Sequence, residues 1–420
     1  MYSILLVLWG LLPLTDEPPQ CRCEAATVCA GESCRELDLD QLLALVDGLP
    51  ELEAAKALEA AAVARAQGAG RLPNPELFGE FEDLGLSNPA FSRSQTTLGL
   101  TQELPLGGRR GAQTKSAQLE ARQAALDLAA TRRLLGTEAA ALFFETLAEA
   151  QRLNLLAAAQ EEARRELLRL RQREGLGEGA GHETLAWEAE LSSTCGALLE
   201  ECDRYQQQLA ALAGLLGEPD WQRLRPVGTL RRSQTPPASV QPDKQAWPEL
   251  EAASVGVQQA RANLEHQHSL AIPDVAIGAG LRGLDGFDGQ TLVFSIALPL
   301  PVFDRNQASI GDAAAQLRRA QAIQRQVAIK GTLKAAQLAQ RLEAVRVQLE
   351  RLHAWTQPAL ERLVKALGLR QAGTGGELAA LMGARERLLE ARLRELELQT
   401  EARRIELEQS LLTGTEVSHE

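Results

Sequence analysis

Hydrophobic and polar residues alternate in two runs between residues 275 and 298, separated by a turn rich in glycine and aspartate. Alternation with a period of two predicts β-strands with one apolar face. The Asp-Gly pairs in the turn suit a hairpin, because glycine readily adopts positive φ angles. The sequence therefore predicts a β-hairpin over residues 273–303. Its alternating apolar positions are Val275, Ile277, Ala279, Leu281, Leu292, Phe294, Ile296 and Leu298.

A weaker version of this pattern comes earlier in the chain. Residues 76–84 and 94–104 alternate less strictly, and a loop separates them. We interpret them as another β-hairpin, 76–104, that ends at Pro105, as the later hairpin ends at Pro299 and Pro301. Proline suits these strand-to-helix junctions because it lacks the N–H that either ladder would use.

Long helical patterns follow both hairpins. Residues 112–173 contain no proline, and after a glycine-rich break a second helix is predicted to return over residues 182–216. Two helices joined by a short turn form an antiparallel helical hairpin. Residues 309–370 and 377–412 repeat this arrangement, with a 4-3-4-3 apolar seam from Leu338 to Leu352 that is typical of coiled coils.

Three residues beyond this seam are also singled out. Pro358 should kink the helix, since it cannot donate the helical hydrogen bond. That kink could bend the helix inward toward its break after residue 370, or it could be a local bend at a solvated face. His353 and Trp355 are expected to be packing residues.

The two halves of the chain correspond to each other. Pro73 matches Pro273, and Gly177 matches Gly373, at an offset of roughly 200 residues, which indicates an internal repeat. The repeat unit is a helix, a β-hairpin and a long helical hairpin. The predicted organisation is a signal peptide at 1–30, a first repeat at 31–217 with its helical hairpin at 112–216, a proline-rich linker at 218–248, a second repeat at 249–414 with its helical hairpin at 309–412, and a tail at 415–420.

The N-terminus indicates export. The apolar stretch 4–14 is too short to span a bilayer and contains Pro13, so it suits a signal peptide, with a candidate cleavage site at residues 28–30. Asp40 can cap the first helix that follows.

The cysteines fall into two groups. Cys21, Cys23, Cys29 and Cys34 crowd the N-terminus, whereas Cys195 and Cys202 lie seven residues apart on a predicted helix. The N-terminal spacing has no CxxC pair, which disfavours a zinc knuckle. The residues before Cys21 disfavour a lipid anchor there. The two helical cysteines lie about 10 Å apart along the axis, too far for a disulfide between them, so buried packing is expected.

Composition and charge narrow the functional classes. The chain is 45% hydrophobic but only 4% aromatic, which suits long helices, and its net charge of −12 is spread among interspersed bases, which disfavours nucleic acid as a partner. No catalytic motif is found, and His266 and His268 lie two residues apart on a helix, so they point apart. We therefore expect no enzyme activity, no cofactor and no resident metal.

Four strands create a physical problem that the chain cannot solve alone. Two hairpins are too few to close a membrane barrel, whose smallest form has eight strands, and open sheet edges are not tolerated in lipid. Three copies would supply twelve strands. The fold class expected is therefore mainly α with a β-barrel part that several copies of the chain complete in lipid.

This duplicated plan and its phrases resemble a known family. The segments PDVAIGAGLRG, LVFSIALPLPVFDRNQ and LRQAGTGGELAALMGARERLLEAR are similar to those of the TolC family of outer-membrane efflux proteins, and especially its cobalt–zinc–cadmium resistance branch. The resemblance covers residues 38–414. It implies a homotrimer in outer-membrane lipid, with a twelve-stranded barrel and a periplasmic α-helical tunnel. The implied partners are a periplasmic adaptor and an inner-membrane resistance–nodulation–division pump. The implied activity is passive conduction of substrates, with heavy-metal cations as one possibility.

By the same resemblance, the breaks in the two helical hairpins, at residues 175–182 and 370–377, lie at the periplasmic tip, where the adaptor docks. The family's acidic ring has no counterpart here, because Ala379 and Met382 occupy the matching positions. His182 could meet a metal ion in transit or simply be solvated at a helix start. The residues assigned to the tip are Gly177, Glu178, His182, Glu183, Arg370, Gly373 and Glu377.

Charged strand positions are assigned to the lumen. Glu80 and Glu82 would be costly on a lipid face, so they and Arg282 are expected to face water inside the barrel. Two other classes stay open on sequence alone. A periplasmic adaptor should have one helical hairpin rather than two, and a coiled-coil scaffold should lack strands that alternate over membrane-spanning length.

Overall fold

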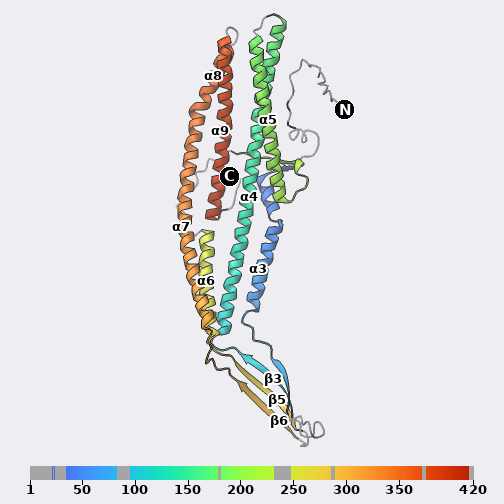
Figure 1. Cartoon of the computed structure of the whole chain (residues 1–420), viewed down its shortest axis with the longest axis vertical. Coiled ribbons are helices and arrows are strands. Elements are labelled where there is room, and N and C mark those ends of the chain that lie inside the picture. The colour runs from blue at the N-terminus through green and yellow to red at the C-terminus, as the bar shows by residue number, and fades with distance from the viewer. Residues whose placement is uncertain are drawn as a thin grey trace, which may run out of the picture.

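The structure is a computed structural model that describes residues 21, 23, 35–82, 95–177, 181–230, 247–284, 289–370 and 375–415. A long helical body stands at one end of a small β-sheet, and both helical hairpins point away from the sheet (Figure 1). None of the helices in these ranges is both long and apolar enough to cross a membrane.

The first repeat begins with two short helices, α2 (Leu39–Val46) and α3 (Pro50–Gly68). The cap of α2 is Asp38 rather than the expected Asp40. The Asp38 side chain accepts from the Gln41 amide at 2.8 Å, and the Gln41 side chain accepts from the Asp38 amide at 3.2 Å. This reciprocal pair satisfies two donors that a helix start leaves free. Pro50 starts α3 at a position where its missing N–H costs nothing.

The strands β2 (Glu76–Glu82) and β3 (Gln95–Leu104) follow, and then come α4 (Arg109–Gly175) and α5 (Gly181–Leu216). With 67 residues, α4 is about 100 Å long at 1.5 Å per residue. It packs against α3, α5, α6 and α9, and so it is the central helix of the molecule. Its buried positions, such as Ala139, Ala140 and Phe143, pack against Leu42 of α2 and Leu212 of α5.

The segment between the repeats contains secondary structure that sequence patterns did not predict. A 3-10 turn (Trp221–Arg223) leads into β4 (Leu224–Pro226), which pairs in parallel with β1 (Arg35–Leu37). Strands of three residues are too short for periodicity to reveal them.

The second repeat contains α6 (Pro248–Ser269), β5 (Val275–Leu284), β6 (Gln290–Ala297), α7 (Gln307–Arg351), α8 (Gln357–Arg370) and α9 (Gly375–Thr413). The coiled-coil seam is confirmed: Leu338, Leu342 and Val345 are buried against α9 residues such as Leu398 and Ile405.

A π-helical segment (Leu352–Thr356) joins α7 to α8, directly before Pro358. Because Pro358 cannot donate to the carbonyl four residues earlier, the wider turn relieves the clash there. The expectation that His353 and Trp355 are packing residues was wrong. The side chain of His353 is half exposed and lies 2.7 Å from the Glu395 carboxylate, and Trp355 is 78% exposed.

The helical cysteines are disulfide-bonded, so the expectation that they serve only as buried packing residues was wrong. Cys195 bonds Cys21 and Cys202 bonds Cys23, each with 5.7 Å between the Cα atoms. Cys195 and Cys202 are not bonded to each other, as their distance along the helix predicted. Each is bonded to a cysteine about 175 residues earlier in the chain, and the spacing along one helix cannot predict such a partner. Cys29 and Cys34 lie outside the described residues.

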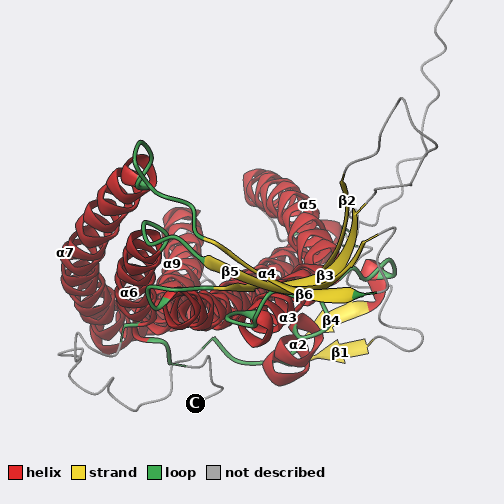
Figure 2. Ribbon diagram, turned by 90° about the horizontal axis from the view of Figure 1, so that it is seen from below, coloured by secondary structure: helices red, strands yellow, loops and turns green. Residues whose placement is uncertain are grey.

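The four-stranded sheet has the order β2-β3-β5-β6, with every neighbouring pair antiparallel. The two hairpins are thus joined side by side through β3 and β5. Seen along the long axis, the sheet extends beneath the helices as an open, curved ribbon (Figure 2). Within the described residues, β2 and β6 each pair on one side only, so both edges of the sheet are open.

Candidate functional site

The sheet has two chemically different faces. On one face, large apolar side chains from all four strands are exposed to a degree that is unusual for a folded protein. Phe294 is 73% exposed and Ile296 is 78% exposed. The apolar face comprises Leu77, Phe81, Leu98, Leu100, Ile277, Leu281, Leu292, Phe294 and Ile296.

The opposite face is formed mainly by small, hydroxyl and charged residues, with Phe78 and Val293 as its larger apolar members. The registers Glu82↔Gln95, Thr97↔Arg282 and Arg282↔Thr291 place these side chains across from one another on neighbouring strands. Since side chains alternate along a strand, none of them lies on the apolar face. A sheet with one apolar and one polar face is the pattern of a wall between lipid and water.

Arg282 is the centre of a polar network on this face. Its guanidinium lies 3.3 Å from the Glu82 carboxylate, and it donates to the Thr97 hydroxyl at 2.9 Å and to the Gln95 side chain at 3.2 Å. Of the residues predicted from sequence, Arg282 and Glu82 are therefore brought together, and Glu80 lies on the same face two residues along β2. The network connects the two repeats, because β3 belongs to the first and β5 to the second.

Glycines on the polar face allow close packing between strands. A Cβ at Gly99 would lie 2.6 Å from the Phe78 ring and 2.7 Å from the Ala279 carbonyl oxygen. The Phe78 ring therefore covers the space that a side chain at residue 99 would fill.

The strand-to-helix junctions contain the predicted prolines. Pro105 follows β3, and the next residues turn through Gly107 and Gly108, whose φ angles of 63° and 75° favour glycine. Pro299 and Pro301 follow β6 in a longer segment, and α7 begins after Asn306 in a left-handed conformation.

An unpredicted ion pair holds the first junction to the second repeat. The Asp274 carboxylate, on the residue before β5, pairs with Arg109 at the start of α4 and accepts from the Leu106 amide at 3.2 Å. Only 10% of the Asp274 side chain is exposed. The consecutive arginines at 109–110 and the acid at the start of the matching strand were the signal that could have suggested this contact.

The far end of the helical body contains the predicted tip residues. α4 ends before Gly177, whose φ is 78°, and His182 and Glu183 begin α5. The second break falls between Arg370 and Gly375, at the same end of the molecule (Figure 1). Glu178 and Gly373 lie outside the described residues, as do the side chains of Arg370 and Glu377.

The positions that match the family's acidic ring are uncharged, and one contributes to packing. Met382 packs against a buried cluster that includes Leu167, Trp187 and Leu378. Arg385, one helical turn further along, lies 5.3 Å from the Trp187 ring centre, and its guanidinium is 3.1 Å from Glu162.

The disulfides and a pair of carboxyl groups lie together on the α4–α5 interface. Cys23 and Cys202 pack with Leu153, Leu156 and Leu198 in one buried cluster.

The carboxyl pair is formed by Glu149 of α4 and its hydrogen-bonded neighbour Glu201 of α5. Burial, and then the neighbouring Glu201 carboxyl, raise the pKa of Glu149 to about 7 against the opposing effect of Arg152 and Arg204. A carboxyl pair in hydrogen-bond contact shares a proton when one member is protonated.

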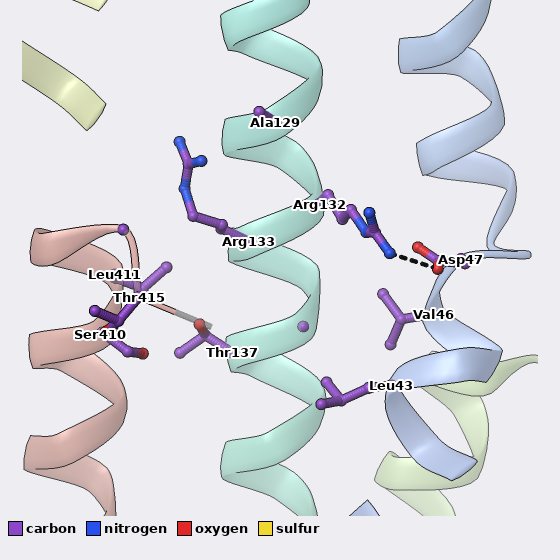
Figure 3. Close-up of a pocket in the computed structure, with 12 residues that line it drawn as sticks. Leu43, Val46, Asp47, Ala129, Arg132, Arg133, Thr137, Ser410, Leu411 and Thr415 are labelled. Carbon is purple, nitrogen blue, oxygen red and sulfur yellow. Dashed lines mark hydrogen bonds and ion pairs between the residues drawn. The ribbon is translucent and has the colours of Figure 1, made fainter. Parts of the chain in front are cut away.

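A cavity of about 330 Å³ lies between α2, α4 and the end of α9 (Figure 3). On one side Arg132 pairs with Asp47 at 2.7 Å, and Arg133 lies on the side of α4 that faces α9. The polar groups that line the cavity are the Asp47 carboxylate, two guanidinium groups and hydroxyl groups, and the guanidinium of Arg133 on the α9 side suits a helix C-terminus.

Comparisons with known proteins show which family and which relatives this chain is similar to. Residues 45–218 match the outer membrane efflux protein family. The chain is 25% identical over 252 residues to the cobalt-zinc-cadmium resistance protein CzcC of Cupriavidus metallidurans, with 60% of this chain and 59% of CzcC covered. It is 28% identical over 297 residues to the nickel and cobalt resistance protein CnrC of the same organism, covering 68% of this chain and 67% of CnrC.

The fold also matches that of a solved channel. The outer membrane protein VceC from Vibrio cholerae superimposes with a TM-score of 0.71 over 90% of this chain and 96% of VceC, at 19% identity. The fold is thus that of the TolC-like outer-membrane channels. Over residues 45–218 the chain is thus similar to outer membrane efflux proteins, in agreement with the resemblance seen in the sequence. It spans about three fifths of the length of CzcC.

Proposed function

We propose that three copies of this chain form the exit duct of a tripartite efflux system. The observation that supports this most directly is the open four-stranded sheet, with an exposed apolar face, a polar face and two unpaired edges. Unpaired backbone groups at an edge cost several kcal/mol each in lipid, so the sheet must be completed by other strands. Three sheets would give twelve strands.

The antiparallel order permits this closure. The first and last strands of a four-stranded antiparallel sheet run in opposite directions, so β6 of one copy can pair antiparallel with β2 of the next. In the resulting barrel the apolar face meets lipid, and the network of Glu80, Glu82 and Arg282 lines the lumen. Carboxylates outnumber the guanidinium group in this set, which favours cations over anions in the lumen.

The helical body then forms the periplasmic part of the duct. Its tip is the docking site for a periplasmic adaptor, which connects it to an inner-membrane resistance–nodulation–division pump. Energy comes from the pump, since a wide water-filled channel conducts passively. Heavy-metal cations are the proposed substrates, by analogy with the relatives named for cobalt, zinc, cadmium and nickel resistance.

Two measurements test this function. Native mass spectrometry of the detergent-extracted protein should give three times the mass of the processed chain, and the assembly should conduct ions in a planar bilayer. The Arg282→Gln variant should make the pore more cation-selective, because it removes a positive charge from the lumen. A monomer with no conductance would reject the duct and favour a scaffold or adaptor.

A further inference from the structure

The apolar face of β6 continues past the end of the strand. Leu292, Phe294 and Ile296 alternate within β6, and the same spacing goes on beyond Ala297. The side chains that continue it, Leu298 (49%), Leu300 (75%) and Val302 (62%), are strongly exposed, and the next residue, Phe303, is 93% exposed. We call residues 298–303 the junction loop.

The junction loop is held in place by hydrogen bonds at its base. The Val302 amide donates to the Leu300 carbonyl at 2.9 Å, and the Arg305 side chain donates to the Pro301 carbonyl at 3.2 Å. The Asn306 side chain donates to the Gln267 carbonyl of α6 at 2.8 Å. A loop fixed in this way displays Phe303 outward at little further entropic cost.

Strand length places Phe303 at the edge of an apolar band. The eight residues of β6, with a rise of about 3.3 Å and a tilt of about 40°, cover roughly 20 Å of the approximately 25 Å apolar band of an outer-membrane barrel. Leu298 and Leu300 would complete the band on the helical side. Val302 and Phe303 then fall at the boundary with water, where aromatic side chains are enriched.

Basic residues gather around the same level of the molecule, although the chain has a net charge of −12. Arg71 follows α3, Arg110 begins α4 and donates to the Gly70 carbonyl at 2.7 Å, and Arg305 follows the junction loop. Two carboxylates close to the loop have partners of their own: Asp274 pairs with Arg109, and Asp304 accepts from the Asn306 amide at 2.8 Å. Guanidinium groups beside an apolar loop complement the phosphates of a lipid surface.

We propose that the junction loop is an interfacial anchor that inserts Phe303 into the headgroup boundary of the bilayer on the helical side of the sheet. The inference rests on the proposed function, because it requires the sheet to lie in lipid. The first repeat cannot supply a matching anchor. Its junction is short, and Gly107 packs so closely on Ile272 that a Cβ there would lie 2.7 Å from the Ile272 side chain.

A photo-crosslinking experiment in intact outer membranes tests the anchor. A benzophenone-bearing phenylalanine analogue replaces Phe303, Phe294 or Trp355 in three separate full-length proteins, and lipid adducts are identified by mass after irradiation. Phe294 reports on the sheet, and Trp355, 78% exposed on the helical body, is the matched control away from lipid. We expect phospholipid adducts at residues 294 and 303 and none at residue 355.

The outcomes separate the two claims. Lipid adducts at 294 with a chain-to-chain crosslink at 303 would overturn the anchor, assign the loop to a contact between copies, and leave the duct standing. The absence of lipid adducts at both 294 and 303 would overturn the proposed function itself. Adducts at all three positions would also overturn the anchor, because residue 303 would then be no different from an exposed helical site.

Discussion

The two helical hairpins share one plan but are stabilised differently. Sixteen residues of α4 are buried, and two disulfides connect the N-terminal segment to α5. In contrast, α7 buries only five residues, and a π-helical segment separates α7 from α8. Exposed apolar residues such as Ile329 and Leu333 lie along α7.

The difference shows how a duplicated element can divide two tasks. The first hairpin forms the core of the single chain, because α4 contacts helices from both repeats. The second hairpin exposes apolar surface that a neighbouring copy would cover in the proposed homotrimer. Stability of the monomer and affinity between copies can then be tested separately.

Removing the disulfides should give the largest effect, confined to the first hairpin. Each bridge closes a loop of more than 170 residues, and the chain-entropy account assigns about 5 kcal/mol to a single bridge of this size. The Cys195→Ser/Cys202→Ser variant should therefore unfold at a markedly lower temperature in detergent, and reductant should lower the unfolding temperature of the parent protein but not of the variant.

The same experiment tests the predicted cleavage at residues 28–30, which the two disulfides oppose because Cys21 and Cys23 precede that site. Removal of residues 1–30 would take away Cys21 and Cys23, and Cys195 and Cys202 would then react with an alkylating agent without reduction. Protection of both from alkylation, with peptides linked as Cys21–Cys195 and Cys23–Cys202, is the expected result. Free thiols at both positions, with equal melting with and without reductant, would contradict it.

A methyl group added at Gly331 should destabilise the second repeat by a smaller amount. A Cβ there would lie 2.4 Å from the Trp247 ring, which anchors the start of α6 on α7. Gly331→Ala should cost about 1–3 kcal/mol because the ring must move out of a filled site.

Gly311→Ala, on the same helix, is the matched control. No atom lies within 4 Å of its added Cβ, so the better helix propensity of alanine should stabilise by up to about 1 kcal/mol. Thermal melts of both variants compare the two sites directly. Equal shifts would mean that Trp247 does not pack on Gly331.

The pH dependence of the first hairpin should be the smallest of these effects. The pKa of Glu149 is raised from 4.5 to about 7, so its folded form binds a proton more tightly than its unfolded form. The stabilisation is full below about pH 4.5 and is lost as the pH rises through about 7. Because Glu149 is partly reached by solvent, we expect the change to be about 1–2 kcal/mol.

Glu149→Gln should flatten this profile, since the amide cannot ionise and can donate to Glu201. Glu138→Gln, on the exposed side of the same helix, controls for the loss of one charge. Chemical unfolding at about pH 5.5 and pH 8 measures the difference. A profile for Glu149→Gln that keeps the slope of the parent protein would show that another group titrates.

The sequence predicted what depends on local periodicity. The strands of the second hairpin, the long helices and the seam at Leu338, Leu342 and Val345 repeat with periods that can be recognised directly. The candidate site was predicted in part, because alternation places Glu82 and Arg282 on one face without showing that they pair across β2, β3 and β5. The Asp274–Arg109 ion pair was missed for the same reason.

Contacts between distant segments could not be predicted in this way. Nothing in the spacing of Cys21 and Cys23 identifies partners on α5, since disulfide pairing depends on tertiary geometry. Pro358 predicted a kink, but a proline in the sequence does not show whether the helix bends or widens into a π-helical turn, as it does over Leu352–Thr356. Trp355 was expected to be a packing residue, but it is 78% exposed, because periodicity does not show which side of the helix α9 covers.

Joining of β2 and β6 between copies is the central claim, and a disulfide crosslink across that edge tests it most directly. Gly79→Cys on β2 would be combined in turn with Leu292→Cys, Phe294→Cys or Ile296→Cys on β6, all on the apolar face, with Cys29 and Cys34 replaced by serine. The account predicts that one pairing gives a covalent ladder ending at three chains under mild oxidation in the membrane. Crosslinks only within one chain, or none from any pairing, would contradict it.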